Sequence, residues 1–161
     1  VLQTARFWIL AASILCVAFA YGGALVHMPQ MLKAQGFSGE QTALVMSLLG
    51  LSIFAGRILT GLLLDRFWAP LVTLPILCLP ALSCFVLSGD SLTLPLAITA
   101  GLLLGFSSGA ETDLVAYLAS RYFGMGHYGR IYGSLYMVFG MASAASPGFY
   151  GAVRDAQGSY D

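Results

Sequence analysis

The chain has 161 residues, of which 58% are hydrophobic and 9% are charged, and its formal net charge is zero. A soluble protein is usually about a quarter charged, so this composition excludes an ordinary soluble domain and indicates an integral membrane protein. The balanced charge argues against a nucleic-acid partner and makes the lipid bilayer the first expected partner.

Five apolar segments are long enough to cross a bilayer, which takes about 20 mostly apolar residues in a helix. They cover residues 7–28 (extendable to 32), 41–64, 70–88, 94–120 and 130–153. Short turns separate them, and Ser38 with Gln41 forms a capping-box pattern before the second segment. No linker divides the chain, so residues 1–161 are predicted to form a single all-α, polytopic transmembrane bundle of five helices.

The first segment carries Tyr21, His27 and Pro29. We expect Tyr21 to lie near a cavity. A single histidine near the end of a membrane helix is either a packing residue or part of proton-linked gating, and both alternatives stay open for His27. Pro29 predicts a local break, because proline lacks a backbone donor and clashes with the preceding turn.

Three charged residues lie in or just after the end of the second segment: Arg57 about two turns before its end, and Asp65 and Arg66 in the turn that follows. A charge at bilayer depth is costly unless it is paired or faces a polar cavity. Arg57 is therefore a candidate to bind a substrate carboxylate; the alternative is a structural arginine that snorkels or pairs with Asp65 or Glu111. Gly61 precedes Asp65 by four residues, a spacing that favours a moving joint over an ordinary interface pair.

The three cysteines, Cys16, Cys78 and Cys84, all lie inside apolar segments. They are expected to be buried single residues without disulfides, and their spacing does not fit a metal site. The chain shows no nucleophile with its base and no phosphate loop. We therefore expect no metal, no cofactor and no enzymatic activity.

In the fourth segment a glycine repeats every four residues, at Gly101, Gly105 and Gly109, which lets a second helix pack closely. Glu111 and Asp113 follow, about 200° apart around a helix, so they cannot both face one cavity. Each is a candidate for coupling or gating, because a carboxyl inside a membrane can carry a proton. The alternative is that one or both reach the interface or bond to neighbouring hydroxyls.

A weak internal repeat relates the first and fourth segments, since residues 23–27 resemble residues 109–113 and another apolar segment follows each. The two segments run in opposite directions, and three-helix inverted repeats are typical of secondary transporters. The repeat predicts a sixth helix beyond these five. In the fifth segment, Tyr136 is expected near a cavity, and the other aromatic residues are expected to serve in packing or at the interface.

Arginine and lysine predict the orientation. One set of helix ends carries Arg6, Arg66, Arg121 and Arg130, and the other carries Lys33 and Arg154. We therefore expect the first helix to start in the cytoplasm, with the protein in a bacterial inner (plasma) membrane.

Several motifs resemble the major facilitator superfamily. Gly61-x-x-x-Asp65-Arg66 resembles its signature loop, although the usual basic tail is replaced by residues 67–70, Phe-Trp-Ala-Pro. Arg57 with Gly61 resembles the eighth helix of the monocarboxylate-transporter and oxalate/formate branches. Residues 121–133 resemble the link from the tenth to the eleventh helix, and residues 146–160 resemble the end of the eleventh.

The resemblance covers essentially the whole chain and implies helices seven to eleven of a twelve-helix carrier, without its last helix and N-terminal six-helix half. In the family, substrate binds between two halves that rock to give alternating access. The resemblance implies that Arg57 contacts a substrate anion, and that Asp65 bridges to a helix start in the missing half, with Gly61 and Arg66 completing a conformational latch. The fifth segment lacks a lysine, which weakens a dicarboxylate assignment.

The leading hypothesis is a secondary transporter of a small organic anion, a monocarboxylate carried with a proton. The bound small molecule would contact Arg57, Tyr21 and Tyr136, while Glu111, Asp113 or His27 would couple or gate. An efflux carrier for drugs or other solutes is an alternative within the same fold. Alternatives of another class are a non-transporting membrane subunit and a membrane enzyme.

Overall fold

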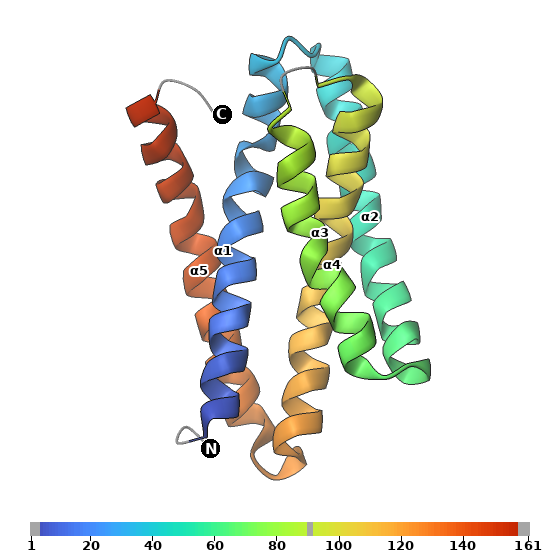
Figure 1. The fold of residues 1–161 in the computed structure, drawn as a ribbon, viewed down its shortest axis with the longest axis vertical. Coiled ribbons are helices and arrows are strands. Elements are labelled where there is room, and N and C mark those ends of the chain that lie inside the picture. The colour runs from blue at the N-terminus through green and yellow to red at the C-terminus, as the bar shows by residue number, and fades with distance from the viewer. Residues whose placement is uncertain (1–3, 90–91, 158–161) are drawn as a thin grey trace.

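Five long helices and one short 3₁₀ turn make up the parts of the chain described by the computed structural model, residues 4–89 and 92–157 (Figure 1). The elements are α1 (Ala5–Ala34), α2 (Gly39–Arg66), α3 (Ala69–Leu87), α4 (Leu94–Phe123), η1 (Met125–His127) and α5 (Tyr128–Gln157). Each long helix corresponds to one predicted segment, with α3 ending one residue before the predicted 88, so the all-helical prediction is confirmed. Residues 158–160 of the C-terminal motif lie outside the described residues.

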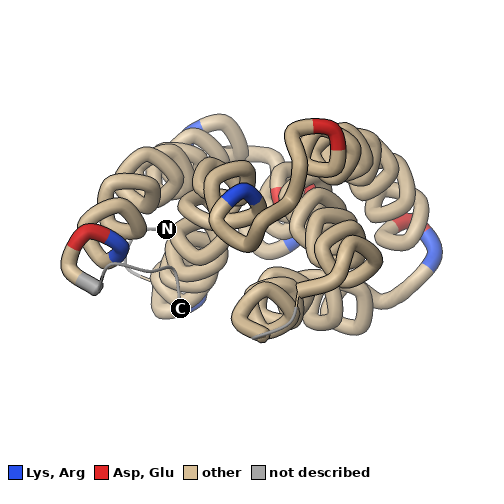
Figure 2. Tube along the Cα trace, turned by 90° about the horizontal axis from the view of Figure 1, so that it is seen from above, with Lys and Arg blue, Asp and Glu red and all other residues tan. Residues whose placement is uncertain are grey.

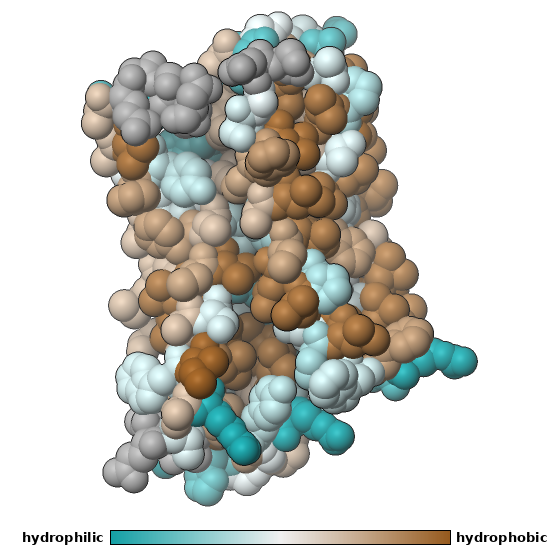
Figure 3. Space-filling model, in the orientation of Figure 1, coloured by the Kyte–Doolittle hydropathy of each residue, from teal (hydrophilic) through white to brown (hydrophobic). Residues whose placement is uncertain are grey.

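Four of these helices, α1 to α4, are long and apolar enough to cross a membrane. Helix α5 is as long as α1 and α4, but it is richer in glycine and tyrosine and does not belong to that set by composition. Large apolar side chains such as Trp68, Leu74 and Phe85 lie exposed on the outside, and Figure 3 shows apolar atoms over most of the visible face. Such a surface suits a lipid environment.

The helices form two parallel pairs. Helix α4 packs along α2, and α1 packs along α5, while α3 covers α4 (Figure 1). Helices α1 and α4 run in opposite directions, as the inverted repeat requires. Figure 2, which looks along the bundle, shows how few charged residues the described helices carry.

The start of α2 forms as predicted. The Ser38 hydroxyl accepts a hydrogen bond from the Gln41 backbone N–H at 3.2 Å, and the Gln41 side-chain oxygen accepts one from the Ser38 N–H at 3.0 Å. These two bonds satisfy donors that the first turn of a helix otherwise leaves without partners.

Pro29 does not break α1, and the predicted interruption is wrong. The helix continues from Ala5 to Ala34 with Pro29 inside it. Met28 and Leu32, which flank the proline, are fully buried in the core shared with α2 and α4. Proline removes one hydrogen bond, and the packing of the surrounding turns holds the helix together, as neighbouring helices do in membrane proteins.

Close packing between α2 and α4 follows the glycine stripe Gly101, Gly105 and Gly109. A Cβ atom added to Gly105 or Gly109 would collide with backbone atoms of α2. Where the backbones come this close, the Ser52 hydroxyl of α2 donates to the Leu102 carbonyl of α4 at 2.6 Å. Because the glycines have no side chains, α2 and α4 approach closely enough to form a direct interhelical hydrogen bond.

Two hydroxyls join α5 to the backbone of α1. The Ser146 hydroxyl accepts a hydrogen bond from the Gly23 N–H at 2.7 Å and donates to the Phe19 carbonyl. The Tyr150 hydroxyl donates to the Ala20 carbonyl at 2.8 Å. A regular helix pairs the N–H of residue 23 with the carbonyl of residue 19, so Ser146 bridges two groups that belong to one helical turn.

Candidate functional site

Arg57 projects from the exposed face of α2, about two and a half turns before the helix ends at Arg66. The Arg57 guanidinium lies within electrostatic range of Tyr132 of α5. It forms no ion pair or hydrogen bond with the other described residues, so neither Asp65 nor Glu111 pairs with it, while a snorkelling arginine stays open as the structural alternative. Within the described ranges, the guanidinium is open to a ligand from outside this bundle.

Asp113 is partly exposed on α4 and, like Arg57, lies within electrostatic range of Tyr132. Arg57, Asp113 and Tyr132 come from three different helices, and we call this group of residues the polar face. Asp113 has no hydrogen-bond or ion-pair partner among the described residues.

Glu111 points the other way, into the bundle, where it is only 1% exposed. The Tyr21 hydroxyl of α1 interacts with the side chain of Ser108. It is also close enough to Glu111 to interact with its carboxyl. Neither carboxyl oxygen meets strict hydrogen-bond geometry with a described residue, although the Tyr21 hydroxyl lies beside the carboxyl. Burying a carboxyl inside a membrane helix costs free energy, and such groups usually have a function.

Tyr21 and Tyr136 differ in their surroundings. Tyr21 is 4% exposed and belongs to the core, whereas Tyr136 of α5 is 45% exposed. The two tyrosines interact electrostatically, so they lie near each other. Together they lead from the buried Glu111 to the outer surface of the bundle.

His27 lies near the other end of α1, away from the polar face. Its Nε2 is 3.0 Å from the Pro147 carbonyl, an arrangement in which the ring N–H donates, and the ring stacks on Tyr150 at 6.3 Å. Both contacts lie at the crossing of α1 and α5. The structure therefore places His27 in helix packing and does not bring it together with Arg57, Glu111 or Asp113.

Gly61, Asp65 and Arg66 occupy the last turns of α2. Asp65 and Arg66 are exposed, and no atom lies within 4 Å of the position that a Cβ of Gly61 would take. Asp65 has no partner among the described residues. This corner of the bundle is therefore open among the described residues.

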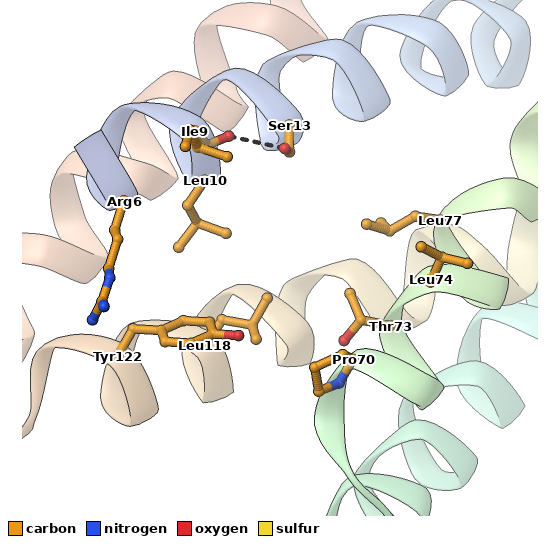
Figure 4. Close-up of a pocket in the computed structure, with 10 residues that line it drawn as sticks. All are labelled: Arg6, Ile9, Leu10, Ser13, Pro70, Thr73, Leu74, Leu77, Leu118 and Tyr122. Carbon is orange, nitrogen blue, oxygen red and sulfur yellow. Dashed lines mark hydrogen bonds between the residues drawn. The ribbon is translucent and has the colours of Figure 1, made fainter.

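A groove of about 430 Å³ lies elsewhere, between α1, α3 and α4 (Figure 4). Its lining includes Leu10, Leu74 and Leu118, with Arg6 and Tyr122 at one end. It contains none of the residues predicted for the site. Substrate sites combine apolar surface with several convergent polar groups, so this groove is a weaker candidate than the polar face.

Sequence reasoning missed Tyr132 as a site residue and grouped it with packing aromatics. Its spacing of four residues from Tyr128 and Tyr136 was the available signal, because residues four apart share one face of a helix. Ser146 and Tyr150 were not recognised as contacts of α1 either. No local pattern identifies a hydroxyl that bonds to the backbone of another helix.

Comparison with known proteins identifies the family to which this chain belongs. The sequence model of the Major Facilitator Superfamily matches residues 1–147. Monocarboxylate transporter 12 of Rattus norvegicus is 28% identical over 96% of this chain and 32% of its own length, and the Homo sapiens protein is 27% identical over 96% and 30%. The benzoate transport protein of Acinetobacter baylyi is 28% identical over 92% of this chain and 34% of its own length. The chain spans about a third of each of these relatives.

Proposed function

This chain belongs to the major facilitator superfamily, a family of transporters and not of enzymes, and from that premise we propose that it forms part of a secondary carrier for a small organic anion. The carrier works by alternating access between two halves. Because the chain covers about a third of its relatives, the proposed carrier includes a further six-helix half that supplies the other wall of the substrate cavity. The relatives' names refer to monocarboxylates and benzoate, which supports a carboxylate as the anion.

Arg57 is the observation that carries this proposal. It is a charged residue inside an otherwise apolar helix, exposed and unpaired among the described residues. An arginine at this depth is stable when it faces a water-filled cavity or an anion, and its planar fork matches a carboxylate. We therefore assign it the substrate carboxylate, with Tyr136 on the adjoining surface and Tyr21 buried behind Tyr136.

Substitution of Arg57 in the full-length carrier tests this assignment. Arg57→Ala is expected to lower uptake of a carboxylate substrate at least about 30-fold. The substitution leaves the substrate carboxylate without its charged partner, which costs about 2 kcal/mol or more of binding free energy. Arg57→Lys should restore part of the loss, because lysine keeps the charge without the fork. Lys33→Gln is the control, because it also removes one positive charge but lies at the exposed far end of α1. It should leave uptake unchanged. Normal uptake and affinity in both Arg57 variants would show that Arg57 is structural.

We assign proton coupling to Glu111, with Tyr21 between it and the surface, and a gating role to Asp113 on the polar face. Glu111 is supported by its burial and its lack of a hydrogen-bond partner. The packing contacts of His27 support a structural role for that residue over a coupling role.

The end of α2 is proposed as a conformational latch. Asp65 would meet the start of a helix in the other half, where unpaired backbone N–H groups favour a carboxylate. The exposure of Asp65 and the open space beside Gly61 support a partner that lies outside the described residues. Arg66 adjoins Asp65 and completes the latch.

The bias of arginine toward one set of helix ends supports a cytoplasmic start for α1. A bacterial inner membrane remains our proposal for its location. The relatives come from mammals as well as from a bacterium, so the family itself is compatible with either kind of cell membrane.

A further inference from the structure

Four aromatic rings form a continuous ladder along one side of α5. Tyr128 and Tyr132 stack with centroids 5.6 Å apart and planes 10° apart. Tyr132 and Tyr136 follow at 5.6 Å and 30°, and Tyr136 and Phe139 at 5.3 Å and 23°. These 11 residue steps span about 16 Å along the helix, so the ladder is much deeper than an aromatic belt at one membrane interface.

The ladder differs from ordinary core packing. Ile131 and Leu135, on the neighbouring side of α5, are buried and supply its contact with the core. Tyr128, Tyr132 and Phe139 are partly buried and pack against that core, whereas Tyr136 is 45% exposed. The core therefore holds three of the four rings in place, and Tyr136 presents the most open surface.

The charges near the ladder argue against lipid as its neighbour. Tyr132 lies within electrostatic range of Arg57 on α2 and Asp113 on α4. Tyr136 interacts with the hydroxyl of Tyr21. Exposing an unpaired guanidinium and a carboxyl to lipid costs free energy. We therefore place the ladder on the same polar face as Arg57.

We propose that the tyrosine ladder, centred on Tyr132 and Tyr136, is the ring-binding part of the substrate site, and that the substrate is an aromatic carboxylate. This inference rests on the proposed function, because it takes the carboxylate of the substrate to bind Arg57. The substrate ring then lies against the exposed tyrosine rings in an offset or edge-on arrangement, the geometries that aromatic pairs prefer. An aliphatic acid of equal size has the carboxylate contact but lacks this ring contact.

Uptake by the full-length carrier tests the inference with three competing acids: benzoate, cyclohexanecarboxylate and lactate. Benzoate is expected to compete about three- to tenfold more strongly than cyclohexanecarboxylate, the difference that aromatic pairing supplies beyond buried area. Tyr132→Leu and Tyr136→Leu should remove this preference, whereas Tyr132→Phe and Tyr136→Phe keep the rings and should keep it. Phe85→Leu, which removes an exposed ring from α3, should change nothing.

The outcomes separate this inference from the proposed function. If uptake of lactate depends on Arg57 while benzoate shows no advantage over cyclohexanecarboxylate, the ladder is not a ring site and the anion carrier stands. If the leucine variants keep the benzoate preference, the inference is equally overturned. If no carboxylate competes at all, both proposals fail. The comparison of acids on the unmodified carrier needs no variant, so poor folding of a leucine variant does not prevent the test.

Discussion

At the residue scale, two carboxyls two positions apart have opposite surroundings. Helix geometry alone separates Glu111 and Asp113 by about 200°, and this prediction needed no structure. The structure shows which carboxyl faces the interior: Glu111 is buried beside Tyr21, and Asp113 is partly exposed near Tyr132. Their assigned roles, coupling for Glu111 and gating for Asp113, follow from this difference.

Glu111→Gln in the full-length carrier is predicted to abolish the stimulation of uptake by an inwardly directed proton gradient. Glutamine keeps the shape of the side chain but cannot bind and release a proton, so exchange of substrate across the membrane should continue without proton coupling. The measurement is uptake with and without an imposed gradient, beside counterflow of labelled substrate. Glu40→Gln, an exposed carboxyl with no assigned role, is the control and should retain the stimulation. Full stimulation in the Glu111 variant would exclude this residue as the coupling group.

At the element scale, the pairing of α2 with α4 depends on missing side chains. The four-residue spacing of glycines indicated a packing surface, and the structure identifies α2 as the helix that lies against it. Gly105 is the most informative position, because the carbonyl of Leu49 and the side chain of Ser52 both lie where a Cβ would go.

Gly105→Ala is predicted to destabilise the carrier by about 1–3 kcal/mol, the usual cost of forcing extra atoms into a packed interior. Gly50→Ala on α2 is the matched control, since nothing lies within 4 Å of its Cβ position. It should be neutral or stabilising by up to about 1 kcal/mol, because alanine favours helices more than glycine. Thermal unfolding of the two purified variants measures both effects, and equal stability would mean that α2 and α4 are not tightly packed at Gly105.

At the scale of the whole molecule, the polar face and the end of α2 both lie open. Arg57, Asp113 and Asp65 have no ion-pair partners among the described residues, while the interior joins α1 to α5 and α2 to α4 by direct hydrogen bonds. The chain spans about a third of the relatives that it matches, and under the proposed function these open groups would face the rest of the carrier.

Asp65→Asn is predicted to slow uptake by the full-length carrier while leaving equilibrium binding of substrate intact. The loss of a carboxylate at a helix start weakens the closed state by up to about 2 kcal/mol, which changes the ratio of the two states by up to about 30-fold. Uptake rate and equilibrium binding are measured on the same preparation. Glu40→Gln, an exposed carboxyl at the opposite end of α2, is the control and should leave both unchanged. A normal uptake rate for the Asp65 variant would contradict the latch.

The sequence by itself determined the membrane class, the five helices, the Ser38 cap, the angular separation of the two carboxyls and the family resemblance. These follow from local quantities: hydropathy over about 20 residues, turn chemistry and helical periodicity. Only the tertiary structure decided that α1 continues through Pro29, that Glu111 lies beside Tyr21 and that Ser146 bonds to the backbone of α1. Each of these depends on which helices pack together and at what height, and contacts between different helices leave no periodic signal in the chain.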